Sequence, residues 1–274
     1  MEKEEAFSKG KFILIEGLNG SGKTTQAQKL AERLNSSGIK TLFNHEPTNG
    51  DFGKIIRQVI EKKMVDRDLL KRVLRAVNEY LGDKEAISTR QFNGQLSAIL
   101  QTLKRHSRLS EKEKQVLFIA DRLDDILNII LPNLKIGTWI VQDRYDLSCY
   151  FHGMSNGVKF EKLKELHREG LNDCYPAPDI LFYYWVPVEV GLKRLLASAK
   201  IIDFYENQEN LKRIELAAKK ILGFETNNPS PHHSLISEIS LYGQSRKVFL
   251  INAEPTIEEV ADETWQYVRK TFNL

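Results

Sequence analysis

Short apolar runs alternate along the chain with longer stretches in which apolar residues recur every three or four positions. Continuous apolar runs are typical of strands buried on both faces of a parallel sheet, and the longer spacing is typical of amphipathic helices. The runs predict five strands, at Phe12–Glu16, Lys40–Asn44, Thr138–Gln142, Asp179–Val186 and Lys247–Asn252. Strands that alternate with helices indicate an α/β fold with a doubly wound, five-stranded parallel sheet flanked by helices.

The helical spacing is regular after the first strand and near the end of the sequence. From Thr24 onward apolar residues recur through Leu34, and the residues Ser-Ser-Gly then predict the end of that helix. The last helix has its apolar positions at Ile257, Val260, Ala261, Trp265 and Val268. Each helix therefore presents one apolar face, as helices that cover a sheet do.

Another helix is predicted between Ser110 and Pro132. Ser110 and Glu113 have the spacing of a capping box, and Pro132 is expected to end the helix. Its apolar stripe consists of Val116, Ala120, Leu123, Leu127 and Ile130. At about 100° per residue, Phe118 lies almost opposite this stripe, and Arg122, one turn later, shares its face.

Two segments fit the alternation of strands and helices less well. Residues 62–110 contain an additional helical pattern, and residues 223–246 include a run rich in Asn, Pro and Ser, which favours a loop. We interpret both as insertions, the first helical and the second a loop, in a single domain that spans residues 1–274. The alternative for residues 62–110 is a small subdomain.

Composition limits the classes of protein to consider. The 274 residues include 40 Lys and Arg against 37 Asp and Glu, a balance that does not favour a nucleic-acid partner. Cys149 and Cys174 are too few for a disulfide framework or a four-thiolate zinc site, so we expect reduced thiols. The apolar runs are too short to span a membrane, and the charged start does not resemble a signal peptide. We therefore expect a cytoplasmic protein with no membrane partner.

The first predicted strand is followed directly by a glycine-rich stretch with the pattern G-x-x-x-x-G-K-[ST]. Its glycines let backbone N–H groups approach phosphates, and the following helix adds the positive end of its dipole. Lys23 is expected to reach the β- and γ-phosphates, and the Thr24 hydroxyl to bind Mg²⁺. We expect ATP to contact Gly17, Leu18, Asn19, Gly20, Ser21, Gly22, Lys23, Thr24 and Thr25.

Other interpretations of this stretch are weaker. A glycine-rich turn with an incidental lysine does not account for the strand before the motif and the helix after it. A GTPase would also carry the patterns D-x-x-G and N-K-x-D, and neither occurs in the chain. The motif alone leaves ATPases and small-molecule kinases open.

Phe118 and Arg122 form a second candidate site. A phenylalanine away from the core stripe can stack on a nucleobase, while the adjacent guanidinium donates hydrogen bonds to the edge of the base. The alternative is that Phe118 packs under residues 62–110 and Arg122 pairs with Asp125. The residue pattern favours neither interpretation over the other.

A third candidate site follows the third predicted strand, at the residues Asp143-Arg144-Tyr145. Ligands of open α/β sheets bind at the carboxyl ends of strands. Asp143 is expected to hold Mg²⁺ or orient a phosphate acceptor, and Arg144 to clamp a phosphate with its planar guanidinium. The alternative is a salt bridge at the end of the strand.

Taken together, these segments resemble the thymidylate kinase family of P-loop nucleoside-monophosphate kinases. FILIEGLNGSGKTT resembles the family's first strand and phosphate loop, HEPTNGDFGKIIR its E-P motif and the next helix, and LFIADR the helix that holds thymine. DRYDLSCYFHG resembles the D-R-Y signature, and DFYENQ the lid, which we place at residues 195–210. PDILFYYWVPVEVGLKR resembles the fourth strand and its helix, and VFLINAEPTIEEV the closing strand and helix.

The resemblance implies a P-loop NTPase fold of the nucleoside-monophosphate kinase type and transfer of the ATP γ-phosphoryl group to dTMP, with ATP and Mg²⁺ as cofactors. It implies catalytic roles for Lys23, Arg144 and Asp143, and Mg²⁺ binding by Thr24 and Asp143. The residues implied to bind dTMP are Glu46, Arg57, Phe118, Arg122, Arg144, Tyr150 and Phe151. Family members commonly form homodimers, so we also expect a homodimer.

Several residues depart from the family pattern. Asn19 stands where members often have an acidic residue, and His45 where they have an arginine. The family supplies a transition-state arginine from the phosphate loop or the lid, but Gly20 takes the loop position and the lid segment offers only Lys200. These departures leave two alternatives open, a kinase of another nucleotide or nucleoside and a nucleotide-binding regulatory protein with weak turnover.

Overall fold

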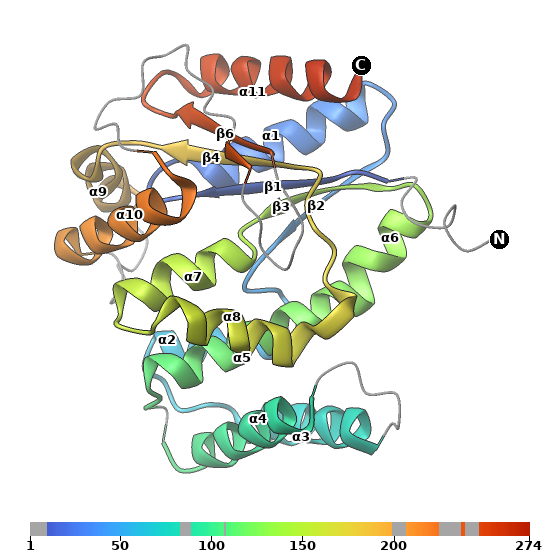
Figure 1. Cartoon of the computed structure of the whole chain (residues 1–274), viewed down its shortest axis with the longest axis vertical. Coiled ribbons are helices and arrows are strands. Elements are labelled where there is room, and N and C mark those ends of the chain that lie inside the picture. The colour runs from blue at the N-terminus through green and yellow to red at the C-terminus, as the bar shows by residue number, and fades with distance from the viewer. Residues whose placement is uncertain (1–9, 83–88, 107, 199–206, 225–236, 239–246) are drawn as a thin grey trace. The chain divides into compact units, whose positions relative to one another are not determined.

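The computed structural model describes residues 10–82, 89–106, 108–198, 207–224, 237–238 and 247–274. The chain divides into two compact units. The first, the sheet unit, consists of Met1–His45, Ile130–Tyr145 and Ala177–Leu274. The second, the helical unit, consists of Glu46–Ile129 and Asp146–Pro176. Figure 1 labels the helices and strands of both units.

The sheet unit contains a six-stranded sheet in the order β2-β3-β1-β4-β6-β5. Five of its strands are parallel: β1 (Phe12–Gly17), β2 (Thr41–His45), β3 (Trp139–Asp143), β4 (Ile180–Trp185) and β6 (Lys247–Asn252). The predicted five-stranded parallel sheet is confirmed, and no end of a strand differs from its prediction by more than one residue. The sequence did not predict the sixth strand, β5 (Ser237–Glu238), which pairs antiparallel with β6.

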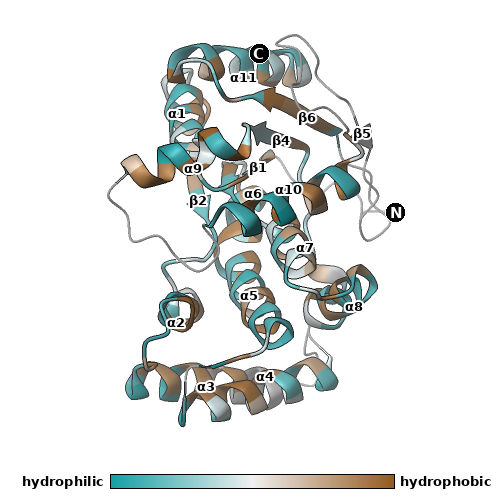
Figure 2. Cartoon of the chain, turned by 90° about the vertical axis from the view of Figure 1, so that its left-hand side faces the viewer, coloured by the Kyte–Doolittle hydropathy of each residue, from teal (hydrophilic) through white to brown (hydrophobic). Residues whose placement is uncertain are grey.

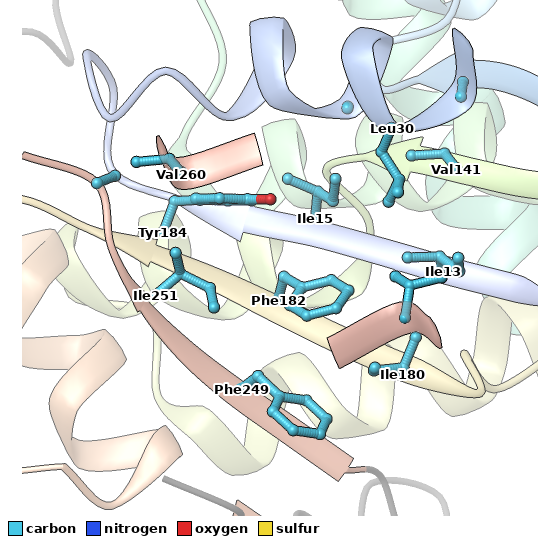
Figure 3. Packing of buried hydrophobic residues seen from close by; sticks show 14 of the residues in the cluster. Ile13, Ile15, Leu30, Val141, Ile180, Phe182, Tyr184, Phe249, Ile251 and Val260 are labelled. Carbon is cyan, nitrogen blue, oxygen red and sulfur yellow. The ribbon is translucent and has the colours of Figure 1, made fainter. Parts of the chain in front are cut away.

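The apolar runs form strands because the sheet is covered on both faces. Every residue of β1 and of β4 is buried. One face is covered by helices α1 (Lys23–Ser36) and α11 (Ile257–Phe272). Ile15 of the sheet packs there in one apolar cluster with Leu30 of α1 and Val260 of α11 (Figure 3). Burial of such side chains contributes most of the free energy that stabilises the fold.

Helix α10 (Gln208–Leu222) packs against the opposite face of the sheet. Successive side chains of a strand point to opposite faces, so Tyr183 and Trp185 of β4 point away from α1. The Trp185 indole N–H donates to Glu215 of α10 at 3.0 Å, and the Tyr183 ring contacts Phe224 just after that helix. The helices on both faces confirm the doubly wound α/β fold.

Two shorter helices complete the described part of the sheet unit, α6 (Leu131–Lys135) and α9 (Val188–Ala197). The helical unit contains α2 (Asp51–Ile60), α3 (Arg67–Gly82), α4 (Arg90–Leu103), α5 (Glu111–Asp125), α7 (Asp146–Ser155) and α8 (Phe160–Leu171). A short 3₁₀ turn at Asn172–Cys174 follows α8.

Residues 62–110 contain helices α3 and α4, which contact each other and also α2 and α5. Apolar and polar residues alternate along both helices (Figure 2). Leu70 and Val73 of α3 and Leu96 and Leu100 of α4 are buried. The helical unit therefore has an apolar core of its own.

The predicted start of α5 is confirmed, but the predicted end of the helix at Pro132 is wrong. Ser110 and Glu113 form the expected capping box. A π-helical turn at Ile126–Ile130 follows α5, and α6 then begins with Pro132 in its first turn. Proline disrupts a regular α-helix because it has no N–H to donate to the carbonyl group four residues earlier. The helical residues run without a break from Glu111 to Lys135, so Pro132 lies inside a continuous helical stretch, directly after the π-helical turn that interrupts the regular hydrogen-bond pattern.

Some expectations lie outside the described residues. These are the central part of the lid, residues 199–206 with Lys200, and residues 225–236 and 239–246 of the expected loop insertion. Among the helices that the structure describes, none is both long enough and apolar enough to cross a membrane.

Candidate active site

The glycine-rich stretch forms a tight loop between β1 and α1. Gly20 and Gly22 have φ angles of 81° and 86°, in the left-handed region that glycine adopts without strain. At Gly20 space is also restricted, because a Cβ atom would lie 2.1 Å from the carbonyl oxygen of Gly191 in α9. Glycine is therefore required at this position for two independent reasons.

The loop leads directly into the N-terminus of α1. Gly22 is the N-cap residue and has no side chain to accept from the first backbone N–H groups of the helix. Those groups and the helix dipole together form an anion-binding site. Lys23, the first residue of α1, is 5% exposed, and its ammonium donates to the carbonyl oxygen of Leu18 at 3.2 Å. The lysine side chain thus folds back over the loop.

Thr24 and Asp143 meet beside the loop. The Thr24 hydroxyl donates to Oδ2 of Asp143, whereas Oδ1 of Asp143 is buried and accepts no hydrogen bond. A hydroxyl and a carboxylate oxygen are the ligands that Mg²⁺ takes in phosphate sites, where phosphates and water complete its shell. Among the described residues, no cluster of three or more His, Cys, Asp and Glu residues could hold a metal. The Thr24–Asp143 pair therefore fits Mg²⁺ bound together with a nucleotide.

Arg144 also contacts the phosphate loop. Its Nη2 donates to Oδ1 of Asn19. Because asparagine is neutral, this contact orients the guanidinium without neutralising its charge. The structure thus brings Asn19, Arg144, Thr24 and Asp143 together with the phosphate loop in the sheet unit.

A cavity of about 250 Å³ adjoins the phosphate loop, and the sequence reasoning missed it. Its lining includes Thr25, Gln26 and Arg194. The Arg194 guanidinium donates to the carbonyl oxygens of Ala253 at 2.8 Å and Glu254 at 3.2 Å. Nothing local signals these contacts, because α9 and the segment after β6 lie about 60 residues apart in the sequence. The cavity is large enough to take part of a nucleotide that the loop binds.

In the helical unit, Arg122 is the centre of a buried polar cluster. It is 0% exposed and forms a bidentate ion pair with Glu46 through Nε, at 3.0 Å, and Nη2. Its Nη1 lies 2.9 Å from Nε2 of His167, and its Nη2 donates to Cys149 Sγ at 3.4 Å. Arg122 and Glu46, two of the predicted dTMP-binding residues, therefore bind each other. Sequence reasoning did not single out His167 or this contact of Cys149.

Burial dominates the electrostatics of this cluster. It raises the pKa of Glu46 above the usual range of a glutamate, and the adjacent Arg122 guanidinium opposes that shift. Burial also raises the pKa of the Cys149 thiol to about 11, although Arg122 lies beside it. Cys149 is therefore a neutral thiol at neutral pH and packs as a small apolar residue.

The other predicted acceptor residues surround this cluster. The Tyr150 ring stacks on His167 with centroids 4.8 Å apart, and Phe151, next to it on α7, is buried. Phe118 is half-buried on α5, one turn before Arg122. Arg57 of α2 donates to the carbonyl oxygens of Pro47 at 3.0 Å and Thr48 at 2.6 Å. The loop that begins with Glu46 is thus held by arginines at two points.

Asp121, which sequence reasoning also missed, holds the same loop. Its carboxylate accepts from the backbone N–H of Thr48 at 2.8 Å and from the Thr48 hydroxyl at 2.6 Å. Burial raises the pKa of Asp121, and these hydrogen bonds oppose the shift. Residues 46–48 are therefore fixed from α2 and α5.

Comparison with known proteins identifies the family. The family model described as thymidylate kinase matches residues 15–76 and 67–229. The probable thymidylate kinase of Pyrococcus abyssi (strain GE5 / Orsay) is 26% identical over 255 residues, which cover 93% of this chain and 94% of the relative. The thymidylate kinase of Brachyspira hyodysenteriae (strain ATCC 49526 / WA1) is 27% identical over 225 residues, covering 82% of this chain and 85% of the relative.

The probable thymidylate kinase of Thermococcus onnurineus (strain NA1) is similar too, with 29% identity over 203 residues, 74% of this chain and 80% of the relative. The residues matched by the family model extend over more than half of the 274 residues. The match includes the phosphate loop from Gly17 onward, the helix with Phe118 and Arg122, and the segment that begins at Asp143. The resemblance inferred from the sequence is confirmed, and the chain belongs to the thymidylate kinase family, a family of phosphotransferases.

Proposed function

We propose that this chain transfers the γ-phosphoryl group of ATP to the 5′-phosphate of dTMP, giving dTDP and ADP. Membership of the thymidylate kinase family implies ATP as the donor and dTMP as the acceptor. The observation that carries the proposal is the phosphate loop with Lys23 folded over it and the Thr24–Asp143 pair beside it. This arrangement suits a bound nucleoside triphosphate.

On the donor side, the residues act by neutralising and aligning charge. The backbone N–H groups of the loop and the N-terminus of α1 bind the phosphates, and Lys23 reaches the β- and γ-phosphates. Thr24 and Asp143 would hold Mg²⁺, which supplies further charge neutralisation when bound. In the reaction an oxygen of the acceptor phosphate forms a bond to the γ-phosphorus. The bond from that phosphorus to the β–γ bridging oxygen breaks, and its electron pair stays on ADP.

On the acceptor side, no strong general base is needed because the attacking phosphate oxygen is already ionised. Arg57 and Arg144 would hold the acceptor phosphate, since a guanidinium binds phosphate with two parallel hydrogen bonds. Catalysis then depends mainly on alignment of the two phosphates. The assignment of these two arginines rests on the resemblance to the family.

The thymine site is proposed at Phe118 and Arg122. The half-buried Phe118 ring would stack on the base, and Arg122 would orient the site through its contacts with Glu46 and His167. Tyr150 and Phe151 would line the sugar and base. We expect a homodimer in the cytoplasm, as the family implies.

A panel of acceptors tests the proposed function. ADP release from ATP is measured with dTMP, dUMP, dCMP, dGMP, thymidine and no acceptor. We expect turnover with dTMP to exceed turnover with every other acceptor by about tenfold or more, the discrimination that one or two specific contacts provide. Faster turnover with a different acceptor would replace dTMP, and tight ATP binding without turnover would favour a regulatory protein.

Arg122→Ala tests the acceptor site separately. Removing the guanidinium leaves the Glu46 carboxylate buried without its ion pair and disorders the proposed base site. We expect the KM for dTMP to rise by about tenfold or more, while the KM for ATP changes little. An unchanged KM for dTMP in a folded variant would contradict this base site.

A further inference from the structure

Arg144 has an unusual backbone conformation for its residue type. Its φ angle is 68°, in the left-handed region. For a residue that is neither Gly, Asn nor Asp, this conformation is strained and persists only when surrounding contacts hold it. The same residue carries the guanidinium that we assign to the acceptor phosphate.

Two side chains hold the peptide group that follows this strained residue, and a backbone carbonyl holds the one that precedes it. Gln142 donates through Nε2 to the carbonyl oxygen of Arg144 at 3.0 Å. Glu16 accepts through Oε1 from the backbone N–H of Tyr145 at 2.9 Å. The N–H of Arg144 itself donates to the carbonyl oxygen of Ile15 at 2.9 Å. The peptide group between Arg144 and Tyr145 is thus fixed at its oxygen and at its nitrogen.

Burial of the polar side chains of Glu16 and Gln142 costs free energy of folding. They lie in the neighbouring strands β1 and β3 and are 1% and 0% exposed. Every other residue of β1 except Gly17 is apolar. A carboxylate or amide that is taken out of water without a hydrogen-bond partner destabilises a fold. Packing alone would favour apolar side chains at both positions, so their hydrogen bonds to the Arg144 peptide group are the feature to explain.

The consequence of this arrangement appears at the side chain of Arg144. The left-handed backbone turns the chain sharply at the end of β3, and the guanidinium contacts Oδ1 of Asn19 in the phosphate loop. If residue 144 were extended, its side chain would point to one face of the sheet, because successive side chains of a strand point to opposite faces. The hydrogen bonds from Glu16 and Gln142 thus act on the peptide group of the residue whose guanidinium contacts the phosphate loop.

We propose that Glu16 and Gln142 are positioning residues that hold Arg144 in the left-handed conformation and so direct its guanidinium to the phosphates. The proposal rests on the proposed function and goes beyond it, because it assigns a role in phosphoryl transfer to two buried residues that contact no substrate. Glu16 contributes the acceptor for the N–H of Tyr145, and Gln142 contributes the donor for the carbonyl group of Arg144.

Steady-state kinetics of the full chain test the proposal. Gln142→Met and Glu16→Met keep the side-chain volume and remove the hydrogen bond, whereas Glu16→Gln keeps an acceptor oxygen without the charge. We expect both methionine variants to lose about tenfold or more in kcat/KM for dTMP, the effect of one lost ordering contact, with the KM for ATP changed by less than about twofold. Glu16→Gln should retain activity within about threefold of the parent.

Thr264→Val is the matched control. Thr264 is 1% exposed and shares a buried hydrogen bond of 2.8 Å with the Tyr184 hydroxyl in the same unit, on the other face of the sheet. Loss of this hydrogen bond in Thr264→Val should lower the free energy of unfolding about as much as Gln142→Met does. It should leave the kinetic constants for dTMP unchanged. The proposal would be overturned if Gln142→Met and Thr264→Val had equal kinetic constants for dTMP. It would also be overturned if Glu16→Gln lost as much kcat/KM as Glu16→Met.

A double-mutant cycle separates positioning from general support of the fold. If Gln142 acts through Arg144, then adding Gln142→Met to Arg144→Ala should lower kcat/KM for dTMP by less than about twofold, because the two residues act as one unit. A further tenfold loss in that background would contradict the proposal.

A spectroscopic measurement keeps the test independent of the acceptor. The side-chain Nε–H resonance of Arg144, assigned by its loss in Arg144→Ala, should be sharp in the parent and in Thr264→Val. We expect it to broaden or shift in Gln142→Met. If the parent does not phosphorylate dTMP but this resonance responds as expected, the proposed function fails and the positioning role stands. A resonance that does not change in Gln142→Met overturns the positioning role whatever the substrate.

Discussion

At the scale of single residues, the cluster around Arg122 shows how a buried cation is satisfied. The His167 Nδ1 lies 2.8 Å from the carbonyl oxygen of Leu163, and its Nε2 lies 2.9 Å from Nη1 of Arg122. A carbonyl oxygen only accepts and a guanidinium only donates, so Nδ1 carries the proton and Nε2 accepts. His167 is therefore a neutral imidazole that satisfies Arg122 without adding a second negative charge beside Glu46.

This arrangement predicts the effect of replacing His167. In His167→Leu a buried guanidinium N–H loses its acceptor, which should lower the free energy of unfolding by about 1–3 kcal/mol. His167→Gln can place an oxygen near the position of Nε2 and should recover part of the loss. Urea denaturation of the two variants measures the difference. Equal stability of the leucine and glutamine variants would contradict the assigned tautomer and its role.

Cys149 predicts a dependence of stability on pH. Its pKa of about 11 in the folded protein exceeds the ordinary value of 9.0, so the folded state keeps a proton that the unfolded state releases. Stability from this thiol is fully present below pH 9 and is lost as pH rises toward 11, by up to about 1.4 kcal/mol per pH unit.

Parallel unfolding measurements on the parent and on Cys149→Ala between pH 8 and pH 11 isolate this contribution from the other groups that titrate there. We expect the difference in stability between the two proteins to shrink as pH rises, because only the parent loses a thiol proton on unfolding. A difference that stays constant over this range would show that the thiol is not shifted.

At the scale of secondary-structure elements, the strands were predictable and the interior of one helix was not. The central strands β1 and β4 are fully buried because both faces of the sheet are covered, so they stand out in the sequence as apolar runs whose bounds can be predicted locally. The start of α5 followed from Ser110 and Glu113, whose side chains act locally. The π-helical turn at Ile126–Ile130 has no comparable local signal, and the helical residues continue past Pro132 to Lys135.

The position of Pro132 predicts a small effect of its replacement. The π-helical turn directly before Pro132 already departs from the regular i→i−4 hydrogen-bond pattern, so Pro132→Ala should change the free energy of unfolding by less than about 1 kcal/mol. Chemical denaturation measures the change. A gain of about 3 kcal/mol on replacement by alanine would show that the proline strains a regular helix interior, and it would contradict this role of the π-helical turn.

At the scale of the whole molecule, the predictability of the candidate site depended on distance along the chain. The phosphate loop is contiguous, so its residues and their order were sufficient to recognise it. The ion pair of Arg122 with Glu46 joins residues 76 positions apart, and its contact with His167 spans 45. No local pattern indicates which of the many charged residues form such pairs. The hydrogen-bond partners of Arg144 and Arg194 could not be predicted from the sequence for the same reason.

Ligand binding to the phosphate loop should stabilise the whole chain. Mg²⁺ and ATP at about 100 times the dissociation constant should add about 2.7 kcal/mol to the free energy of unfolding, because the unfolded chain binds neither. Lys23→Ala removes the ammonium that folds over the loop and should abolish both this stabilisation and turnover, while the ligand-free variant stays folded.

Thermal unfolding with and without Mg²⁺ and ATP tests this prediction. EDTA should remove most of the stabilisation in the parent, because Thr24 and Asp143 then lose the ion that links them to the phosphates. Equal shifts of the Tm in the parent and in Lys23→Ala would contradict the assignment of the phosphate loop.

The close approach of Gly20 to α9 restricts how this chain can change. Residue 20 has a φ angle of 81°, and a Cβ atom added there would lie only 2.1 Å from the Gly191 carbonyl oxygen, so the position has no room for any side chain. An arginine therefore cannot be introduced at position 20 by a single substitution. Any mutational path toward one must first displace α9, so a second cation for the phosphates, beside Lys23, has to come from another position in the chain.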